Sequence, residues 1–449
     1  HASSDGSPSR PPVEWRGVSA RHLGAFVRVV ARLTLRGRCV HPSDDRFHNL
    51  CATAGETTGV SRHRLFGSLC AMVFLVNFAR VVFAPLVGEF IDEFGIREGT
   101  AGLVVTLVWL GSASPRVPTG WILTRVPRLP VVLAAGTTLT LGALGVAVAR
   151  SVPALLLTSF LVGIASGVYF VAANPLVSEL FPDRVGRVMG IHGTASQLAA
   201  VVAAPVVTVA LWLDWRYAFV ALAAAAALTT ALIGLLGRRT TLPDAGRDDT
   251  DFVAGARSEW RLVVAAVVLI GLTSFVWQGL FNFYELYMLE KGLAPTTARN
   301  LLTLIFAAGV PAFLVSGEIA DRLPSVPFIL AIVTAFLASV VAVVLASGLL
   351  AVAVASVLVG FSIHMLFPAG DTYLLGSLPD EARASAYAVF SAGMMTTQAA
   401  GSWVVGEAIE AGVSYDGVFV TAAAGLAVLV LVYAVANAAG RVPGGAAGS

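Results

Sequence analysis

The stretch SGEIADRL, residues 316–323, decides the fold expected for this chain. It closes one apolar run, sets Asp321 beside Arg322, and is followed almost at once by a second apolar run. A weaker copy of the same corner, PTGWILTRV, occupies residues 118–126. A glycine followed five residues later by an arginine, at a corner between apolar segments and found twice in one chain, indicates an internal repeat.

The composition is typical of a membrane protein. Of the 449 residues, 57% are apolar and 12% are charged, and the mean hydropathy is +0.82, whereas soluble domains carry about 25% charged residues. A soluble fold cannot bury so much apolar surface, so the expected surrounding is a lipid bilayer. The net charge of +2 favours no nucleic-acid partner, and the three cysteines have no metal-ligand spacing, so we expect neither metal nor cofactor.

Twelve apolar runs are long enough to cross the hydrocarbon core, which needs about 20 residues. They are expected to be helices because open sheet edges are not stable in lipid. The predicted fold class is therefore an all-α integral membrane protein with two six-helix bundles. The expected spans are residues 65–87, 99–121, 130–149, 153–174, 188–210, 215–236, 262–287, 296–316, 327–346, 349–370, 385–406 and 416–438.

Arginine placement predicts the orientation. If the N-terminus is cytoplasmic, most loop arginines fall on the inside, as the positive-inside rule requires. We therefore expect a multi-pass protein of the plasma membrane with both termini in the cytoplasm. The basic residues left for the outside loops are Arg97, Arg150, Arg216, Lys291 and Arg299.

The longest loop follows the sixth span and is polar, with mixed charge and several Pro and Gly residues. This composition is typical of a linker. The expected divisions are an N-terminal extension 1–64, a six-helix bundle 65–236, a cytoplasmic linker 237–261, a second bundle 262–438 and a tail 439–449.

The two halves share Gly, Pro and polar positions at one constant interval, the interval between Gly120 and Gly317. Chance similarity between apolar helices would not keep such positions in register across several loops, so two homologous halves of parallel topology are expected. Further pairs are Gly95 with Gly292, Thr100 with Thr297, Ala101 with Ala298, Ser159 with Ser356, Gly163 with Gly360 and Pro182 with Pro379.

With this repeat, the span count and the G-x-x-x-D-R corner after spans two and eight, the chain resembles the major facilitator superfamily over about residues 65–438. The second copy keeps Gly317, Asp321 and Arg322 and then departs at Pro324, whereas Thr124 replaces the acid of the first copy. The resemblance implies a monomer that binds a small-molecule substrate at a central site around which the two halves rock.

The corners then predict a cytoplasmic gate. A small glycine would let neighbouring helices approach, and the Asp321–Arg322 pair would engage when the inner end closes. The alternative is that these arginines are only positive-inside anchors. The expected gate residues are Gly120, Arg125, Arg128, Glu179, Gly317, Asp321, Arg322 and Asp371.

The sequence motifs give no support for ATP hydrolysis or for enzyme chemistry. The chain has no G-x-x-x-x-G-K-[ST] loop, no H-E-x-x-H and no G-x-S-x-G. A gradient-driven carrier is therefore favoured over an intramembrane enzyme, and a transporter-like sensor that binds ligand without flux remains a third interpretation.

Arg80 is the strongest candidate substrate contact. It lies in the first span three residues after Asn77, on one helix face, and an intramembrane charge costs about 2.5–3.5 kcal/mol. It resembles an arginine that anion carriers of the superfamily have at a similar place, and a guanidinium suits a carboxylate or phosphate. An ion pair with a nearby acid, or snorkelling, is the structural alternative. The organophosphate carriers of the superfamily also place a basic residue in span seven, and this chain has none there, so the resemblance argues against a phosphate substrate.

Other polar residues within the spans complete the predicted cavity. The stripe in span seven is expected to face either the cavity or a neighbouring helix, and Glu285 and His364 are the proton-coupling candidates. Arg116 is expected to anchor to headgroups. The stripe is Ser274, Gln278, Asn282 and Glu285, and the other expected cavity residues are Tyr169, Gln197, His364 and Gln398.

A small organic anion with proton coupling is thus the leading substrate class, and multidrug or metabolite efflux is the alternative. Drug antiporters of the superfamily typically have an arginine where this chain has Ser159 and a glycine-rich motif where it has only Pro205. Residues 22–38 are either a basic amphipathic helix on the inner leaflet or part of a reading frame extended upstream of a start near Val60.

Overall fold

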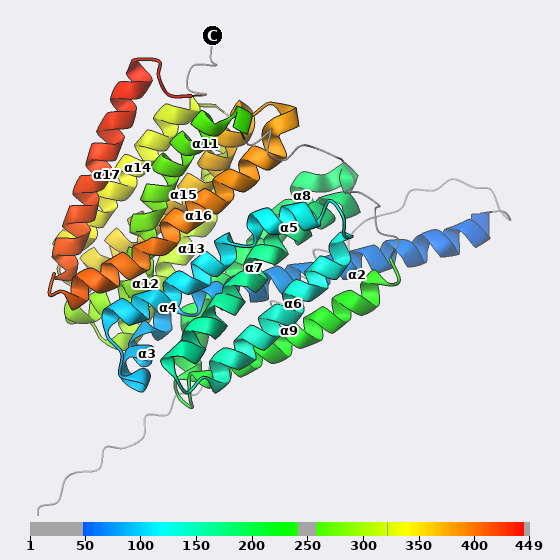
Figure 1. Ribbon diagram of the computed structural model, residues 1–449, viewed down its shortest axis with the longest axis horizontal. Helices are drawn as coiled ribbons and strands as arrows, with labels where there is room; N and C mark the ends of the chain where they lie inside the picture. The colour runs from blue at the N-terminus through cyan, green and yellow to red at the C-terminus, as the bar shows by residue number, and fades with distance from the viewer. Residues whose placement is uncertain (1–47, 241–256, 321, 444–449) are drawn as a thin grey trace, which may run out of the picture. The chain divides into compact units, whose positions relative to one another are not determined.

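The structure is a computed structural model that describes residues 48–240, 257–320 and 322–443. Within this part of the chain every regular element is helical, as Figure 1 shows. The expected all-α fold is confirmed. The predictions for residues 1–47 and for Asp321 lie outside the described residues.

The first half of the chain contains six helical passages, two of which are interrupted. Span one is broken near Pro85, and span two is broken at Ser114 and Pro115. The elements are α2 (His48–Val81), η1 (Ala84–Leu86), α3 (Val87–Phe94), α4 (Glu98–Ala113), α5 (Arg116–Ile122), α6 (Arg128–Val148), α7 (Val152–Leu180), η2 (Pro182–Arg184), α8 (Val185–Ala210) and α9 (Arg216–Gly237).

The second half repeats this order with its interruption in span seven, where a π-helical turn, η3, joins two α-helices. The elements are α11 (Trp260–Ala266), η3 (Val267–Gly271), α12 (Leu272–Glu290), α13 (Pro295–Ala320), α14 (Ser325–Leu345), α15 (Leu349–Ser377), α16 (Asp380–Glu410) and α17 (Tyr415–Ala438).

Among the described residues, 10 helices are long and apolar enough to cross a membrane. Two of the expected spans are not in this set. In span 99–121 the backbone is interrupted beside Pro115. Span 385–406 lies in the polar 31-residue helix α16. The fold agrees with twelve spans, and the exact count stays a prediction. Helices α7 and α15 also extend beyond the predicted ends at 174 and 370.

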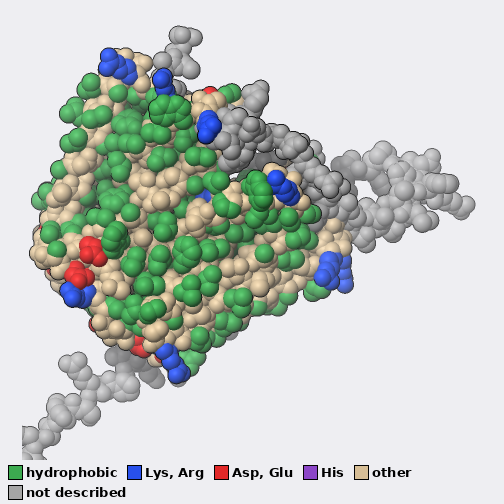
Figure 2. Space-filling view, viewed as in Figure 1, with side chains coloured by type: hydrophobic (Ala, Val, Ile, Leu, Met, Phe, Trp, Pro, Cys, Tyr) green, Lys and Arg blue, Asp and Glu red, His purple; other side chains and the backbone are tan. Residues whose placement is uncertain are grey.

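The outer surface suits a bilayer. Figure 2 shows hydrophobic side chains across the sides of the helices, with charged side chains gathered toward the helix ends. Large apolar residues are exposed on this surface, which would be unfavourable in water but not in lipid. The most exposed of them include Val148, Leu213, Leu228, Leu345 and Leu350.

Matching glycines show that the halves are built alike. In α7, a Cβ on Gly163 would lie 2.1 Å from the carbonyl oxygen of Val108 in α4. In α15, a Cβ on Gly360 would lie 2.1 Å from the carbonyl oxygen of Ile305 in α13. Only glycine permits either helix pair to approach this closely. The sequence repeat therefore has a packing counterpart.

The halves meet mainly where α4 packs on α16 and α8 packs on α13. At one end of this contact, Arg97 at the start of α4 pairs with Glu410 at the end of α16, 2.7 Å apart. Gly406 fits so closely against α4 that an added Cβ would lie 2.3 Å from the carbonyl oxygen of Glu98. This is the predicted outer end, and it is closed.

Candidate substrate cavity between the two halves

A cavity of about 780 Å³ lies between the halves and is lined by residues of both. It extends from Asn77 and Arg80 to Gly120, Thr124 and Asp371, which lie at the predicted cytoplasmic end. The opposite end is closed by the Arg97–Glu410 contact, so the cavity is open only toward the end that the sequence predicts to be cytoplasmic.

Arg80 lies deep in this cavity and is 8% exposed. One of its terminal nitrogens donates to the side-chain oxygen of Asn77, whose own amide donates to the carbonyl oxygen of Ser196 at 2.7 Å. The guanidinium carbon lies 4.8 Å from the ring centre of Trp109 and 4.9 Å from that of Phe170. Asn77 and two aromatic faces therefore orient the cation.

Within the described part of the chain, no carboxylate lies within ion-pair distance of Arg80. Its Nε atom is buried and has no hydrogen-bond partner there. The structural alternative of an ion pair with a nearby acid is thus not found among these residues. A buried cation that keeps an unused donor is able to bind an anion.

The polar stripe of α12 does not line the cavity, contrary to the expected cavity placement. The Asn282 amide donates to Ser402 Oγ at 2.7 Å, and the Gln398 amide donates to Gln278 Oε1 at 3.4 Å. Gln278 and Ser274 are fully buried. These groups find partners on α16 or lie in the protein interior, so the stripe provides interhelical packing, the second of the two predicted roles.

The cavity face of α12 is aromatic instead. Trp277 and Phe281 stack with ring centres 5.4 Å apart, and Phe306 lies edge-on to both. His364 packs edge-on against Trp277, with 5.8 Å between ring centres, and its Nδ1 lies 2.7 Å from the carbonyl oxygen of Gly360. With Phe313 and Phe367, these rings form what we call the aromatic wall.

Gln197 and Gln398 also line the cavity, as expected. Tyr169 does not. Its side chain is fully buried and donates to the carbonyl oxygen of Leu69 at 2.7 Å, while the next residue, Phe170, faces the cavity. Phe170, and not the predicted Tyr169, is therefore the cavity-lining residue.

Arg116 is the main cavity residue that sequence analysis assigned elsewhere. Rather than extending to headgroups, it lines the cavity, where Nε donates to Ser112 O at 3.2 Å and Nη1 donates to Ser391 Oγ at 2.8 Å. Ser391 belongs to α16, so this bond joins the two halves. An arginine within an apolar run can indicate a cavity residue. Arg116 lies near the end of its span, however, which favoured the prediction that it reaches the headgroups.

Asp371 lines the inner part of the cavity, and its Oδ1 accepts a hydrogen bond from the Tyr387 hydroxyl at 2.9 Å. Tyr387 and His192 are further lining residues that sequence analysis did not single out. Neither carries a motif, and only the folded arrangement brings them to the cavity.

Glu285 is not among the cavity-lining residues. It pairs with Arg299 of α13, Oε1 to Nε 3.2 Å, and the two side chains are 14% and 11% exposed. Glu285 is therefore held in a buried ion pair between α12 and α13. His364, the other coupling candidate, does line the cavity.

The predicted gate residues fall into separate groups. Arg128 and Glu179 form an ion pair within the first half, and Arg128 and Gly120 line the cavity. Arg125 stacks over Trp121, with 3.8 Å from guanidinium carbon to ring centre.

The second copy of the corner is open in this state. Arg322, in the turn after α13, pairs with Glu318 in the last turn of α13 at 2.7 Å, and both side chains are largely exposed. No atom lies within 4 Å of a Cβ built on Gly317, so the expected close helix approach is absent at that glycine. Separated inner helix ends account for both observations.

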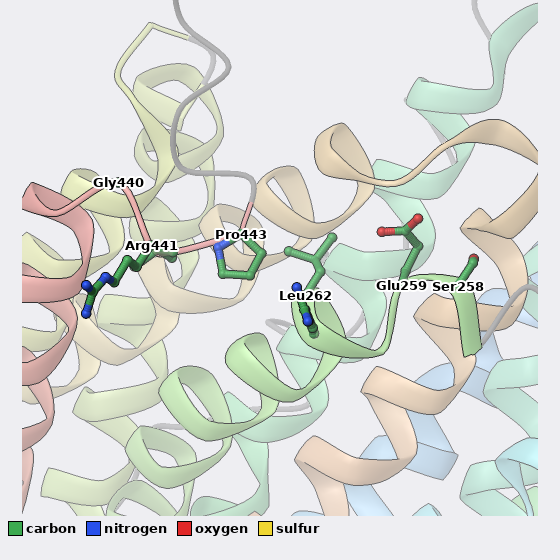
Figure 3. A pocket seen from close by; sticks show the side chains of 8 residues that line it. Ser258, Glu259, Leu262, Gly440, Arg441 and Pro443 are labelled. Atoms are coloured by element: carbon green, nitrogen blue, oxygen red, sulfur yellow. The ribbon is translucent and has the colours of Figure 1, made fainter.

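A smaller hollow of about 380 Å³ lies beside the start of α11 and is lined by Glu259, Arg261, Leu262 and the segment Gly440–Pro443. Figure 3 shows the charged ends of Glu259 and Arg441 pointing in different directions. We assign no site there. The described residues also contain no group of three or more His, Cys, Asp or Glu placed to hold a metal ion.

Comparison with known sequences identifies the family. The sequence model described as Major Facilitator Superfamily matches residues 69–363 and 267–447. The probable sulfoacetate transporter SauU of Cupriavidus necator is 26% identical over 283 residues, which are 59% of this chain and 64% of that protein. The MFS-type transporter pytF of Aspergillus terreus is 27% identical over 177 residues, 38% of this chain and 57% of that protein. The match thus spans less than two thirds of either relative.

Solved structures agree on the fold. A bacterial homologue of the human lysosomal transporter Spinster, inward-facing and unoccupied, superposes with a TM-score of 0.67 at 16% identity, covering 86% of this chain and 97% of that one. A POT family transporter in complex with 5-aminolevulinic acid gives a TM-score of 0.69 at 15% identity, covering 83% and 95%.

Proposed function

This chain belongs to the Major Facilitator Superfamily, and on that premise we propose that it carries a small organic anion across the plasma membrane, coupled to protons. The observation that carries the proposal is Arg80, a buried guanidinium in the central cavity with no acid partner among the described residues. Both termini are proposed to be cytoplasmic, so the open end of the cavity faces the cell interior.

The energetic argument starts from the cost of Arg80. A charge at mid-membrane is unfavourable by about 2.5–3.5 kcal/mol on the insertion scale. Asn77 and two ring faces offset part of this cost, but none of them is negatively charged. A carboxylate or sulfonate would supply the missing charge and accept from Nε, so anion binding is the favoured role.

The aromatic wall suits the organic part of the anion. It faces the first-half residues across the cavity, and Trp277, Phe306 and Phe313 supply apolar area without charge. An inorganic anion would leave this wall without a partner. One half therefore supplies the charge contact and the other the apolar contact, as expected for a site between two rocking halves.

The similarity to a probable sulfoacetate transporter, 26% identical over 283 residues, supports an organic anion as substrate. Lipophilic cations, the substrates of the efflux alternative, would meet Arg80 and Arg116 in the same cavity and be repelled. No enzymatic role is proposed for a chain of this family.

Proton coupling is proposed to use His364 or Glu285. His364 lines the cavity as part of the aromatic wall, so its charge would be sensitive to a bound anion. Glu285 pairs with Arg299 between α12 and α13, so its protonation would release a contact between two helices. His364→Gln and Glu285→Gln test the two sites separately.

The experiment is anion uptake into proteoliposomes that contain a pH-sensitive dye. Sulfoacetate, propionate, a sugar and a lipophilic cation are compared in wild type, Arg80→Ala and the exposed-surface control Arg150→Gln. We expect sulfoacetate uptake with internal acidification, lost in Arg80→Ala and kept in the control. Flux of the cation alone, insensitive to Arg80, would instead support efflux. Binding without flux of any compound would support a sensor.

A further inference from the structure

A second arginine without an acid partner shares the cavity with Arg80. Arg116 lines the same cavity. Among the described residues no carboxylate lies within ion-pair distance of Arg116, which bonds only to a backbone carbonyl and to the Ser391 hydroxyl. The third arginine of the cavity, Arg128, is paired with Glu179.

We propose that Arg116 is a second anion contact, and that the transported anion carries two acid groups, one bound by Arg80 and one by Arg116. This inference rests on the proposed function and narrows its substrate class to organic dianions, such as a dicarboxylate or a sulfonate that also carries a carboxylate.

The charge balance of the cavity supports this assignment. Two like charges in a cavity of low dielectric repel more strongly than they would in water. Asp371 lies in the same cavity, but its Oδ1 accepts from Tyr387 and it does not reach either arginine within ion-pair distance. A monoanion would neutralise one guanidinium and leave the other unpaired, whereas a dianion neutralises both.

The second span places Arg116 in the cavity that holds Arg80. Arg80 stacks on Trp109 of α4, and Arg116 begins α5, just after the interruption at Ser114 and Pro115. Both arginines line the same cavity, so the proposal requires an anion long enough to contact both.

Arg116 also connects binding to the second half. Its Nη1 donates to Ser391 of α16, while the atoms that hold Arg80 come from the first half, Asn77 and the rings of Trp109 and Phe170. The second acid group would therefore bind at the point where α5 and α16 face each other across the cavity. An acid group bound to Arg116 would either replace the hydrogen bond from Arg116 to Ser391 or bind beside it. That hydrogen bond is a contact between the two halves.

The test is competition for labelled sulfoacetate uptake in proteoliposomes at pH 7.5. Succinate is the dianionic competitor and butyrate is its four-carbon monoanionic match. The variants are wild type, Arg116→Gln, Arg116→Lys and the control Arg150→Gln, all checked for monodispersity by size exclusion. Arg80→Gln reports separately on the proposed function.

In wild type we expect succinate to compete at concentrations at least tenfold lower than butyrate. Arg116→Gln should reduce this ratio to about twofold or less, Arg116→Lys should restore part of it, and Arg150→Gln should leave it unchanged. Equal competition by succinate and butyrate in wild type overturns the inference without any variant. An unchanged ratio in a folded Arg116→Gln protein also overturns it.

The two proposals fail in different ways. If uptake of sulfoacetate depends on Arg80 but butyrate competes as well as succinate, the anion-carrier function stands and the dianion assignment falls. If no anion is taken up in an Arg80-dependent manner, the proposed function itself is wrong.

Discussion

Asn77 orients Arg80, the residue proposed to bind the anion. Its side-chain oxygen accepts from Arg80 and its amide donates to the Ser196 carbonyl, so one side chain links the cation to α8. The rings of Trp109 and Phe170 restrict the guanidinium further. The proposed anion site is therefore pre-arranged by neighbours that carry no charge themselves.

Replacing Asn77 by Leu should weaken substrate binding without abolishing transport. A hydrogen bond to a charged group contributes about 1.5–3 kcal/mol, so the apparent KM for the anion should rise about 10-fold or more with a smaller change in kcat. Uptake kinetics in proteoliposomes measure this. Thr138→Val removes an exposed hydroxyl that bonds only to its own helix and is the control. An unchanged KM in Asn77→Leu would mean that Arg80 is held by other contacts.

At this scale the sequence predicted part of the site. Arg80 was identifiable because an arginine in the middle of an apolar run is costly. The stripe of Ser274, Gln278 and Asn282 was identifiable as a polar face, but a membrane helix can turn such a face toward a cavity or toward another helix. The choice depends on whether α16 offers partners such as Ser402, and periodicity within one helix does not contain that information.

Glycine contacts fix how closely the helices approach. Gly163 and Gly360 occupy matching places in the two halves, against the backbones of α4 and α13. Gly425 in α17 is the opposite case, since no atom lies within 4 Å of a Cβ built there. Matching glycines are thus required at helix crossings and unneeded on the lipid-facing helix.

Gly163→Ala and Gly360→Ala should each destabilise the protein, because the added methyl group meets a backbone carbonyl that cannot move aside. Overpacking of this kind costs about 1–3 kcal/mol. Thermal unfolding in detergent should show a lower Tm for both variants, and no decrease for Gly425→Ala. A Tm equal to wild type in the first two would indicate that the helix pairs are less tightly packed than described.

Helix boundaries show what the sequence predicts well and what it does not. The length of the apolar runs located the membrane passages, because the thickness of the bilayer sets how long a spanning helix must be. The interruptions at Pro85 and Pro115 and the π-helical turn Val267–Gly271 were not predicted as breaks. Proline is tolerated within membrane helices when neighbouring groups satisfy the backbone, so its presence alone does not determine where a helix stops.

For the whole molecule, the distribution of contacts between the halves defines the state. The predicted outer end is closed by Arg97 with Glu410 and by the fit of Gly406 against Glu98. The predicted inner end is open, and Arg322 pairs with Glu318 of the helix that it follows, within the same half. The repeat in the sequence predicted two halves, but which end is closed depends on contacts between them.

Arg97→Glu should shift the molecule away from the state in which the predicted outer end is closed, because two carboxylates would then meet at that end. Since Arg97 is 77% exposed, the effect is modest, about 1 kcal/mol or a roughly fivefold change in population. Alkylation of Thr124→Cys, a cavity position at the inner end, should become slower. Arg150→Glu is the charge-reversal control and should have no effect, and equal labelling rates in both variants would contradict the assigned role of the Arg97–Glu410 pair.

The central claim, that Arg80 binds the acid group of an organic anion, is tested most directly by calorimetric titration of the purified protein with sulfoacetate. This measures binding without requiring a gradient or a transport cycle. The account predicts saturable binding to wild type and to Arg150→Gln, and at least a 10-fold weaker Kd in Arg80→Gln. Equal affinity in wild type and a folded Arg80→Gln protein would contradict it and would reduce Arg80 to a structural residue.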